Sequence, residues 1–221
     1  MDLNLNELAL CSVGGDGVAM TPAMTLALDA NFGSVERWRD EFVAIGQSHA
    51  GAAGWLVLLF RPTEGTLVSR WVAEATPDLN GGIPILAIAC GQQPCPTDKI
   101  DWASAYQRYQ HAAHEAGEPF GASADDAAGA VLLDVRRAGV FAQAAQLIPG
   151  ARWCDPAGVK QWAAELPAGR EVLVYCVYGH EVGRTTALRL RAAGLNARFL
   201  RGGIDAWQAA GRPLAPKGES S

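Results

Sequence analysis

The C-terminal half of the sequence predicts an α/β fold built on a doubly wound parallel sheet. Short apolar segments, such as residues 131–134 and 172–175, alternate there with helical stretches, as a parallel sheet covered on both faces requires. In front of it, apolar runs that follow two capped helices predict an α+β domain with a three-stranded antiparallel sheet. The chain has 221 residues, of which 49% are hydrophobic, so it is long enough to bury two cores.

The elements of the first domain follow from caps and apolar runs. Thr21 and Ser34 are good N-cap residues, so we expect helices from Pro22 to about residue 31 and from about residue 35 to 48. The expected strands, and the helix that closes the domain, are residues 54–60, 66–72, 85–89 and 101–116.

In the second domain, the predicted helices are residues 137–145, 156–166, 182–193 and 204–210. Asp155 is a good N-cap for the second of these, and Pro156 suits a first helical position. Gly194 follows the third helix, where a left-handed C-cap residue is expected. We expect domains at 1–118 and 130–221, joined by a linker over 119–129, where small and turn residues replace periodic ones.

The charge and the targeting signals of the sequence indicate which partners and which compartment to expect. The net charge is −5 and there is no basic run, which argues against nucleic acid and anionic membrane surfaces. No segment approaches the length of a membrane span, and the N-terminus has no cationic leader. Five scattered cysteines suit a reducing compartment. We therefore expect a cytoplasmic protein.

Cys176 is the strongest candidate for a reactive residue. It ends a buried-strand run and opens the loop that leads to the helix expected from Val182. The backbone N–H groups and the positive dipole end of that helix would favour a thiolate, the reactive form of cysteine. The same turn is an anion cradle. A buried structural cysteine is the alternative.

About ninety residues around Cys176 carry an ordered set of motifs. They are Val131-Leu-Leu-Asp-Val-Arg136, Ile148-Pro-Gly-Ala151, Val172-Leu-Val-Tyr-Cys176, Gly194-Leu195, Phe199-Leu-Arg-Gly-Gly-Ile-Asp-Ala-Trp207 and Gly211-Arg-Pro213. This set resembles the rhodanese (sulfurtransferase) domain. The resemblance implies that Asp134 and Arg136 brace the active-site loop, although a solvated side chain is an equal alternative for Arg136.

The loop departs from the pattern of that family. Glu181 occupies the usual arginine position of the sulfurtransferases, and Val182 the arginine position of the phosphatase and arsenate-reductase relatives. Gly194 also lies one residue further from Cys176 than the family pattern has it, which suggests a longer loop. A guanidinium is the natural partner of a phosphate-like dianion, so its replacement argues against phosphoryl chemistry. His180 and Arg184 are the remaining cationic candidates, the latter with the alternative of facing away.

The first domain carries a second resemblance. Gly14-Gly-Asp-Gly17, Phe32-Gly-Ser-Val-Glu-Arg-Trp38, Asp40-Glu-Phe42, Gly54-Trp-Leu-Val57, Gly65-Thr-Leu-Val68, Ile85-Leu-Ala-Ile-Ala89 and Trp102-Ala-Ser-Ala-Tyr106 resemble the C-terminal domain of iron/manganese superoxide dismutases. The ligand positions that the resemblance implies are lost. Two of them fall on Ala89 and Gln93, or on Ile100 and Ser104 in a second alignment. Another falls on Asn6, and the segment with the first histidine is absent, so the domain is degenerate and we expect neither a metal nor a cofactor.

Other metal or redox clusters are weaker. His111 and His114, with Glu115, share a helical face that suits zinc or iron, but no third ligand segment accompanies them and a solvated face is favoured. Cys90 and Cys95 are close enough in sequence for a regulatory disulfide, although loop cysteines without a role are favoured. We expect Cys11 and Cys154 to be buried.

The resemblances together imply a sulfurtransferase of the thiosulfate type. Cys176 would attack a sulfane donor and pass the sulfur from a persulfide to a thiol or cyanide. The loop residues expected to bind the substrate are Val177, Tyr178, Gly179, His180, Glu181, Val182, Gly183 and Arg184. The alternatives are a cysteine-based oxyanion reductase or phosphatase and a non-catalytic sensing or scaffold protein. Similar domains are associated with chromate resistance in some bacteria. The expected partners are a small sulfur compound, a thiol acceptor and a second copy of the chain, bound through the first domain.

Overall fold

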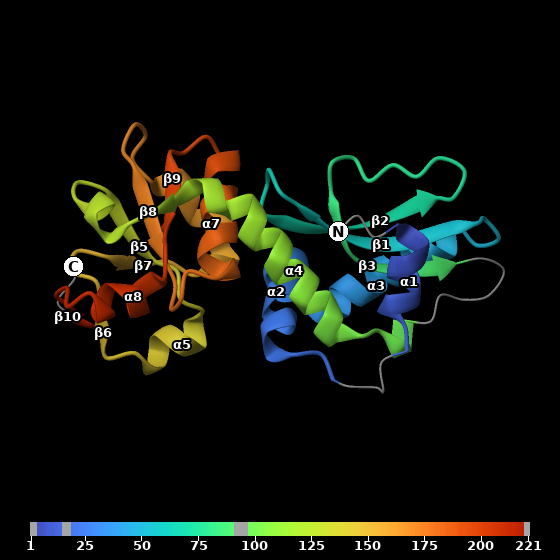
Figure 1. Cartoon of the computed structure of the whole chain (residues 1–221), viewed down its shortest axis with the longest axis horizontal. Helices are drawn as coiled ribbons and strands as arrows, with labels where there is room; N and C mark the ends of the chain where they lie inside the picture. Colours follow the sequence, from blue (N-terminus) through green and yellow to red (C-terminus); the bar gives the residue numbers. More distant parts are fainter. Residues whose placement is uncertain (1–3, 15–18, 91–96, 219–221) are drawn as a thin grey trace. The chain divides into compact units, whose positions relative to one another are not determined.

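The chain divides into two compact units. The computed structural model describes residues 4–14, 19–90 and 97–218. The first unit comprises residues 1–61 and 66–112, and the second comprises residues 62–65 and 113–221 (Figure 1). Within the part of the chain so described, no helix combines the length and the apolar character that crossing a membrane demands.

The first unit is α+β, as predicted. Its elements are α1 (Leu5–Ser12), α2 (Pro22–Phe32), α3 (Val35–Ser48), β1 (Gly54–Arg61), β2 (Thr66–Ala73), β3 (Ile83–Cys90), the 3₁₀ helix η1 (Thr97–Lys99) and the larger part of α4 (Trp102–Gly117), whose last five residues belong to the second unit. The sheet is antiparallel with the order β2-β1-β3. Seven of the eight residues of β1 are buried, because this central strand is covered on both faces. Both predicted N-caps are present: Thr21 accepts from the Met24 N–H, and Ser34 accepts from the Arg37 N–H.

The second unit contains a five-stranded parallel sheet with the order β4-β9-β8-β5-β7. Its strands are β4 (Gly121–Ala122), β5 (Val131–Asp134), β7 (Arg152–Trp153), β8 (Val172–Tyr175) and β9 (Ala197–Leu200). A separate antiparallel pair joins β6 (Gln146–Leu147) to β10 (Ala215–Pro216). The helical elements are η2 (Glu118–Phe120), η3 (Ala124–Ala127), α5 (Ala138–Gln143), η4 (Pro156–Gly158), α6 (Val159–Trp162), η5 (Ala163–Glu165), α7 (Glu181–Ala192) and α8 (Gly203–Ala209).

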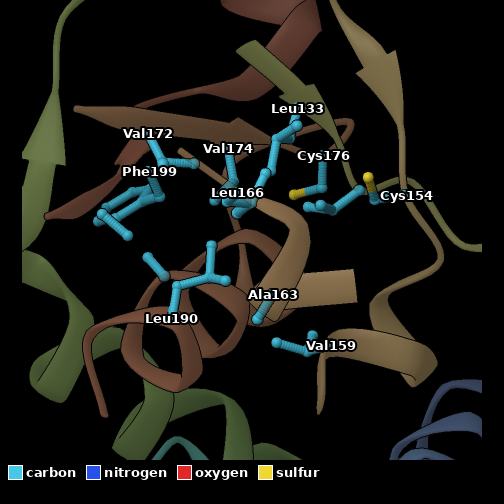
Figure 2. Close-up of a cluster of buried hydrophobic side chains, with 13 residues drawn as sticks. Leu133, Cys154, Val159, Ala163, Leu166, Val172, Val174, Cys176, Leu190 and Phe199 are labelled. Carbon is cyan, nitrogen blue, oxygen red and sulfur yellow. The ribbon is translucent and has the colours of Figure 1, made fainter. Parts of the chain in front are cut away.

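Alternate residues of β8 enter two different cores, so the sheet is doubly wound as predicted. Val172 and Val174 belong to a cluster that includes Leu190 of α7 (Figure 2). Leu173 and Tyr175 belong to the opposite cluster, which includes Trp207 of α8. Both faces of the central strand are therefore buried under helices, and its carboxyl end leads into the loop that begins at Cys176.

Two expectations about local structure need adjustment. The helix predicted over 156–166 is divided into η4, α6 and η5. Its N-terminal cap is present, since Asp155 accepts from the Ala157 N–H, but the backbone of Gly158 leaves helical geometry (φ −97°, ψ 20°) and interrupts the run. The segment expected as a linker over 119–129 contains β4, whose two residues are buried and paired with β9. These residues therefore complete the second sheet.

Candidate active site

Cys176 lies at the carboxyl end of β8, the middle strand of the parallel sheet. Four residues separate it from α7, which begins at Glu181. The ends of parallel strands are where open α/β sheets place ligands. The apolar pattern of β8 and the glycines of the loop together position the Cys176 thiol at that edge.

Three backbone N–H groups converge on the sulfur of Cys176. They belong to Gly179, His180 and Gly183, and each acts to lower the pKa of the thiol. Gly183 lies so close that a Cβ atom there would be 3.4 Å from the sulfur. Such a ring of N–H donors stabilises negative charge on the sulfur and on atoms attached to it.

Burial nevertheless outweighs these donors. The Cys176 side chain is only 6% exposed, and loss of solvation is the largest influence on its pKa, with the negative charge of Glu181 acting in the same direction. The net result is a raised pKa. We expected the loop to stabilise a thiolate, and its N–H groups act in that direction, but desolvation, which penalises the charged form, acts more strongly against it.

The first turn of α8 donates hydrogen bonds to the backbone of the loop. The N–H groups of Ile204 and Asp205 donate to the carbonyl oxygens of Cys176 and Val177, each at 3.0 Å. This contact needs Gly203, which has a φ of 58° and approaches those two carbonyls so closely that a Cβ atom would clash with them. The sequence marked this glycine only as part of a motif, because the pairing joins segments that are distant in the chain.

Asp134 and Arg136 form a buried ion pair that supports the residue before Cys176. The Arg136 Nε lies 3.0 and 2.9 Å from the two carboxylate oxygens of Asp134. The Tyr175 hydroxyl donates to the same carboxylate at 3.0 Å and accepts from the Ile148 N–H at 3.2 Å. Burial, and then Asp134, raise the pKa of Tyr175. Arg136 is only 6% exposed, so the alternative of a solvated arginine is wrong.

The loop side chains differ in their exposure. Tyr178 is 56% exposed and His180 is also exposed, with their ring centroids 5.6 Å apart. Val177 and Val182 are partly buried, and Gly179 is buried. A substrate that reaches the sulfur would meet the backbone of the loop and this exposed aromatic pair.

Arg184 faces away from the sulfur and braces the loop instead. Its Nε donates to the carbonyl oxygen of Gly179 at 3.0 Å, and its Nη1 donates to the Glu118 carboxylate at 2.7 Å. The guanidinium also lies 4.2 Å from the centre of the Phe199 ring. The alternative that Arg184 turns away on its helix is the one that fits this geometry.

Sequence reasoning missed Arg137, which supplies a cation next to the loop. Its Nη2 lies 3.0 Å from the Glu181 carboxylate, whose side chain is 6% exposed. Residues 137 and 181 are 44 positions apart, so no local pattern joins them. The available signal was the unusual carboxylate at position 181, because a buried carboxylate requires a partner.

The other cysteines and histidines that the structure describes have different surroundings. Cys154 is buried in the same cluster as Cys176, as predicted (Figure 2). Cys11 is exposed, contrary to our prediction. Cys90 is disulfide-bonded. Cys95, the partner that its spacing suggests, lies outside the described residues. On α4, His111 and His114 are exposed, and the latter lies 3.9 Å from Glu118.

The donor set of the first unit does not fit a dismutase metal. Among residues 4–14, 19–90 and 97–218, no three His, Cys, Asp or Glu side chains form a group that could hold an ion. The ring of His49 instead stacks on Trp71. Gln93, at one predicted ligand position, lies outside the described residues. Ala89 and Ile100 lack a donor atom, and Ser104 donates to Asp101 at 2.6 Å.

Comparison with known families agrees with this division of the chain. Residues 121–210 match the model of the rhodanese-like domain. The second unit contains a rhodanese-like domain. Residues 20–90 match the C-terminal domain of iron/manganese superoxide dismutases. Both resemblances are thereby confirmed.

Individual relatives cover one part of the chain each. An iron superoxide dismutase of Cupriavidus metallidurans is 38% identical over 102 residues, which are 46% of this chain and 51% of that protein. The chain thus spans about half the length of this curated relative. The rhodanese-like part is similar to a full-length protein from Lactobacillus plantarum (25% identity, 45% of this chain and 90% of the other, TM-score 0.41). It is also similar to a thiosulfate sulfurtransferase from Pseudomonas aeruginosa (27% identity, 42% of this chain and 17% of the other, TM-score 0.37).

Proposed function

We propose that the rhodanese-like domain transfers sulfane sulfur through a persulfide on Cys176. The observation that carries this proposal is the ring of Gly179, His180 and Gly183 N–H groups around the sulfur at the end of β8. N–H donors fixed in advance stabilise a thiolate and a persulfide anion without a metal or an organic cofactor. The membership of the domain in the rhodanese-like family supports the same chemistry.

The reaction has two half-steps. The thiol first loses its proton to solvent, and the Cys176 thiolate attacks the outer sulfur of thiosulfate. The sulfur–sulfur bond of the donor breaks, its electron pair leaves with sulfite, and a Cys176 persulfide anion remains. A thiolate acceptor then attacks the terminal sulfur, so the acceptor leaves as a persulfide and the Cys176 thiolate is restored. Cyanide would leave as thiocyanate.

The pairing of the arginines near the loop with carboxylates supports this choice over an oxyanion reductase or a phosphatase. A phosphate-like dianion calls for a guanidinium that can bind it in bidentate fashion. Here the Arg137 side chain is paired with Glu181 and that of Arg184 with Glu118. A link to chromate resistance would need the same cationic group.

The test of this proposal is mass measurement of the intact protein after incubation with a sulfane donor. The wild-type chain gains about 32 Da, one sulfur atom. Cys176→Ser loses both the added mass and turnover. Cys154→Ala is the matched control, since Cys154 is a buried thiol of the same hydrophobic cluster, and it keeps both. Turnover that survives in Cys176→Ser would refute the nucleophile assignment.

The first unit has a separate role in this proposal. The residues that the structure describes in this unit do not fit a redox metal. We assign to the unit the binding of a partner, with a second copy of the chain as the occupant. Sedimentation of the full-length protein over a range of concentrations tests this role, and a monomer at all concentrations would contradict self-association.

A further inference from the structure

The ion pair between Arg137 and Glu181 lies beside Cys176, but neither side chain has a role in the sulfur-transfer steps described above. Glu181 is the first residue of α7, and its charge acts directly on Cys176. Its carboxylate lies 3.0 Å from the Arg137 guanidinium, and the two side chains are 6% and 23% exposed. The pair is therefore partly shielded from solvent, where charges act over longer distances than in water.

The other arginines around the loop are also matched by carboxylates. Arg136 is bonded to Asp134, and Arg184 to Glu118. These three arginines thus face three carboxylates, and the side-chain charges of the three pairs sum to zero, while Glu118 also binds Arg201, whose side chain is 50% exposed. Negative charge on a donor would be stabilised mainly by the N–H groups of Gly179, His180 and Gly183.

Because these ion pairs carry no net charge, the site stabilises a sulfur donor with one negative charge better than it stabilises a donor with two. The loop N–H groups can hold one negative charge close to the sulfur, but a second charge on the donor finds the Arg137 cation already offset by Glu181. The second charge therefore gains little interaction energy from these side chains. A dianion such as thiosulfate is at a disadvantage relative to a donor with one negative charge.

We propose that Glu181, by neutralising Arg137, makes the Cys176 site select monoanionic sulfane donors, such as organic thiosulfonates and hydropersulfides, over the thiosulfate dianion. This inference rests on the proposed function, because it concerns the first half-step of the same reaction. With methanethiosulfonate, the Cys176 thiolate attacks the sulfane sulfur and the bond to the sulfonyl sulfur breaks. Methanesulfinate leaves with the electron pair, and the same Cys176 persulfide anion remains.

The experiment compares kcat/KM for thiosulfate with kcat/KM for methanethiosulfonate. The two donors share a sulfonyl-type leaving group and differ by one charge, so the ratio of the two values isolates the effect of that charge. A change in the acidity of Cys176 alters both values equally and cancels in the ratio. Glu181→Gln keeps the shape and a hydrogen bond to Arg137 but removes the negative charge.

The expected result is a thiosulfate-to-methanethiosulfonate ratio about tenfold higher in Glu181→Gln, which corresponds to about 1.4 kcal/mol. In the double variant Arg137→Gln/Glu181→Gln the side-chain charge returns to zero, so the ratio returns to the wild-type value. Added salt should reduce the difference between Glu181→Gln and the wild type, since screening weakens interactions at partly exposed charges.

Glu171→Gln is the matched control. Glu171 stands just before β8, at the opposite end of the strand from Cys176, and lies 3.3 Å from Arg198. The same chemical change there leaves the ratio unaltered. An unchanged ratio in Glu181→Gln, or an equal change in Glu171→Gln, would overturn the inference while the Cys176 persulfide still forms. Failure of both donors to modify wild-type Cys176 would overturn the proposed function itself, and the inference with it.

Discussion

Arg184→Met tests whether a buried guanidinium holds the catalytic loop in place. Methionine keeps much of the aliphatic volume but loses the hydrogen bonds to the Gly179 carbonyl, the His114 carbonyl and the Glu118 carboxylate. A hydrogen bond from a charged donor contributes about 1.5–3 kcal/mol, and the cation above the Phe199 ring about 1 kcal/mol more. Glu118 is 44% exposed and keeps Arg201, so its share is small. We expect a loss of about 3 kcal/mol in the stability of the second unit.

Hydrogen exchange of the native protein measures this loss locally. A two-unit chain need not unfold in one step, so a single melting temperature would mix the two units. Faster exchange should concentrate in β8, β9 and the loop from Cys176, and persulfide formation should slow because the Gly179 N–H is less well positioned. Arg201→Met is the control: Arg201 is bonded to the same carboxylate but is 50% exposed. Equal effects of the two substitutions would refute the idea that the Gly179 contact matters.

Two further predictions concern acidity and metal. Because burial raises the pKa of Cys176, the reactive thiolate becomes more abundant with rising pH. The rate of persulfide formation should therefore still be rising above about pH 8.5, the ordinary value for cysteine. A plateau near neutrality in single-turnover measurements would contradict this direction. Elemental analysis should find well under one iron or manganese per chain, without superoxide dismutation above buffer, whereas stoichiometric metal that survives chelation would point to His111, His114 and Glu115.

Local sequence patterns were sufficient where an element makes most of its own contacts. The run from Val172 to Tyr175 predicted β8, and Gly194, with a φ of 86°, ends α7 as expected. The two-residue strands β4, β6, β7 and β10 were not predicted. Such short strands carry no periodicity and exist only because a distant segment pairs with them. The helix predicted over 156–166 is interrupted at Gly158, where the backbone leaves helical geometry, and helix propensity alone does not give the position of such an interruption.

The same contrast between local patterns and long-range contacts holds for the residues of the candidate site. Cys176 and Asp134 could be found from sequence, because each ends an apolar strand at the same edge of the sheet. The pairing of Arg137 with Glu181 could not, since it depends on how α7 lies against the segment after β5. The raised pKa of Cys176 was missed for a related reason: the N–H donors follow from the loop sequence, whereas the larger cost of burial depends on the completed core.

The hydrogen bonds from α8 fix the backbone of the loop independently of the loop's exposed side chains. Main-chain bonds from Ile204 and Asp205 fix the carbonyls of Cys176 and Val177 without help from the loop side chains. Tyr178 and His180 project outward from that frame and are exposed. We therefore expect that substitutions at these two positions change which acceptors bind. The geometry around the sulfur should stay the same, because main-chain hydrogen bonds determine it.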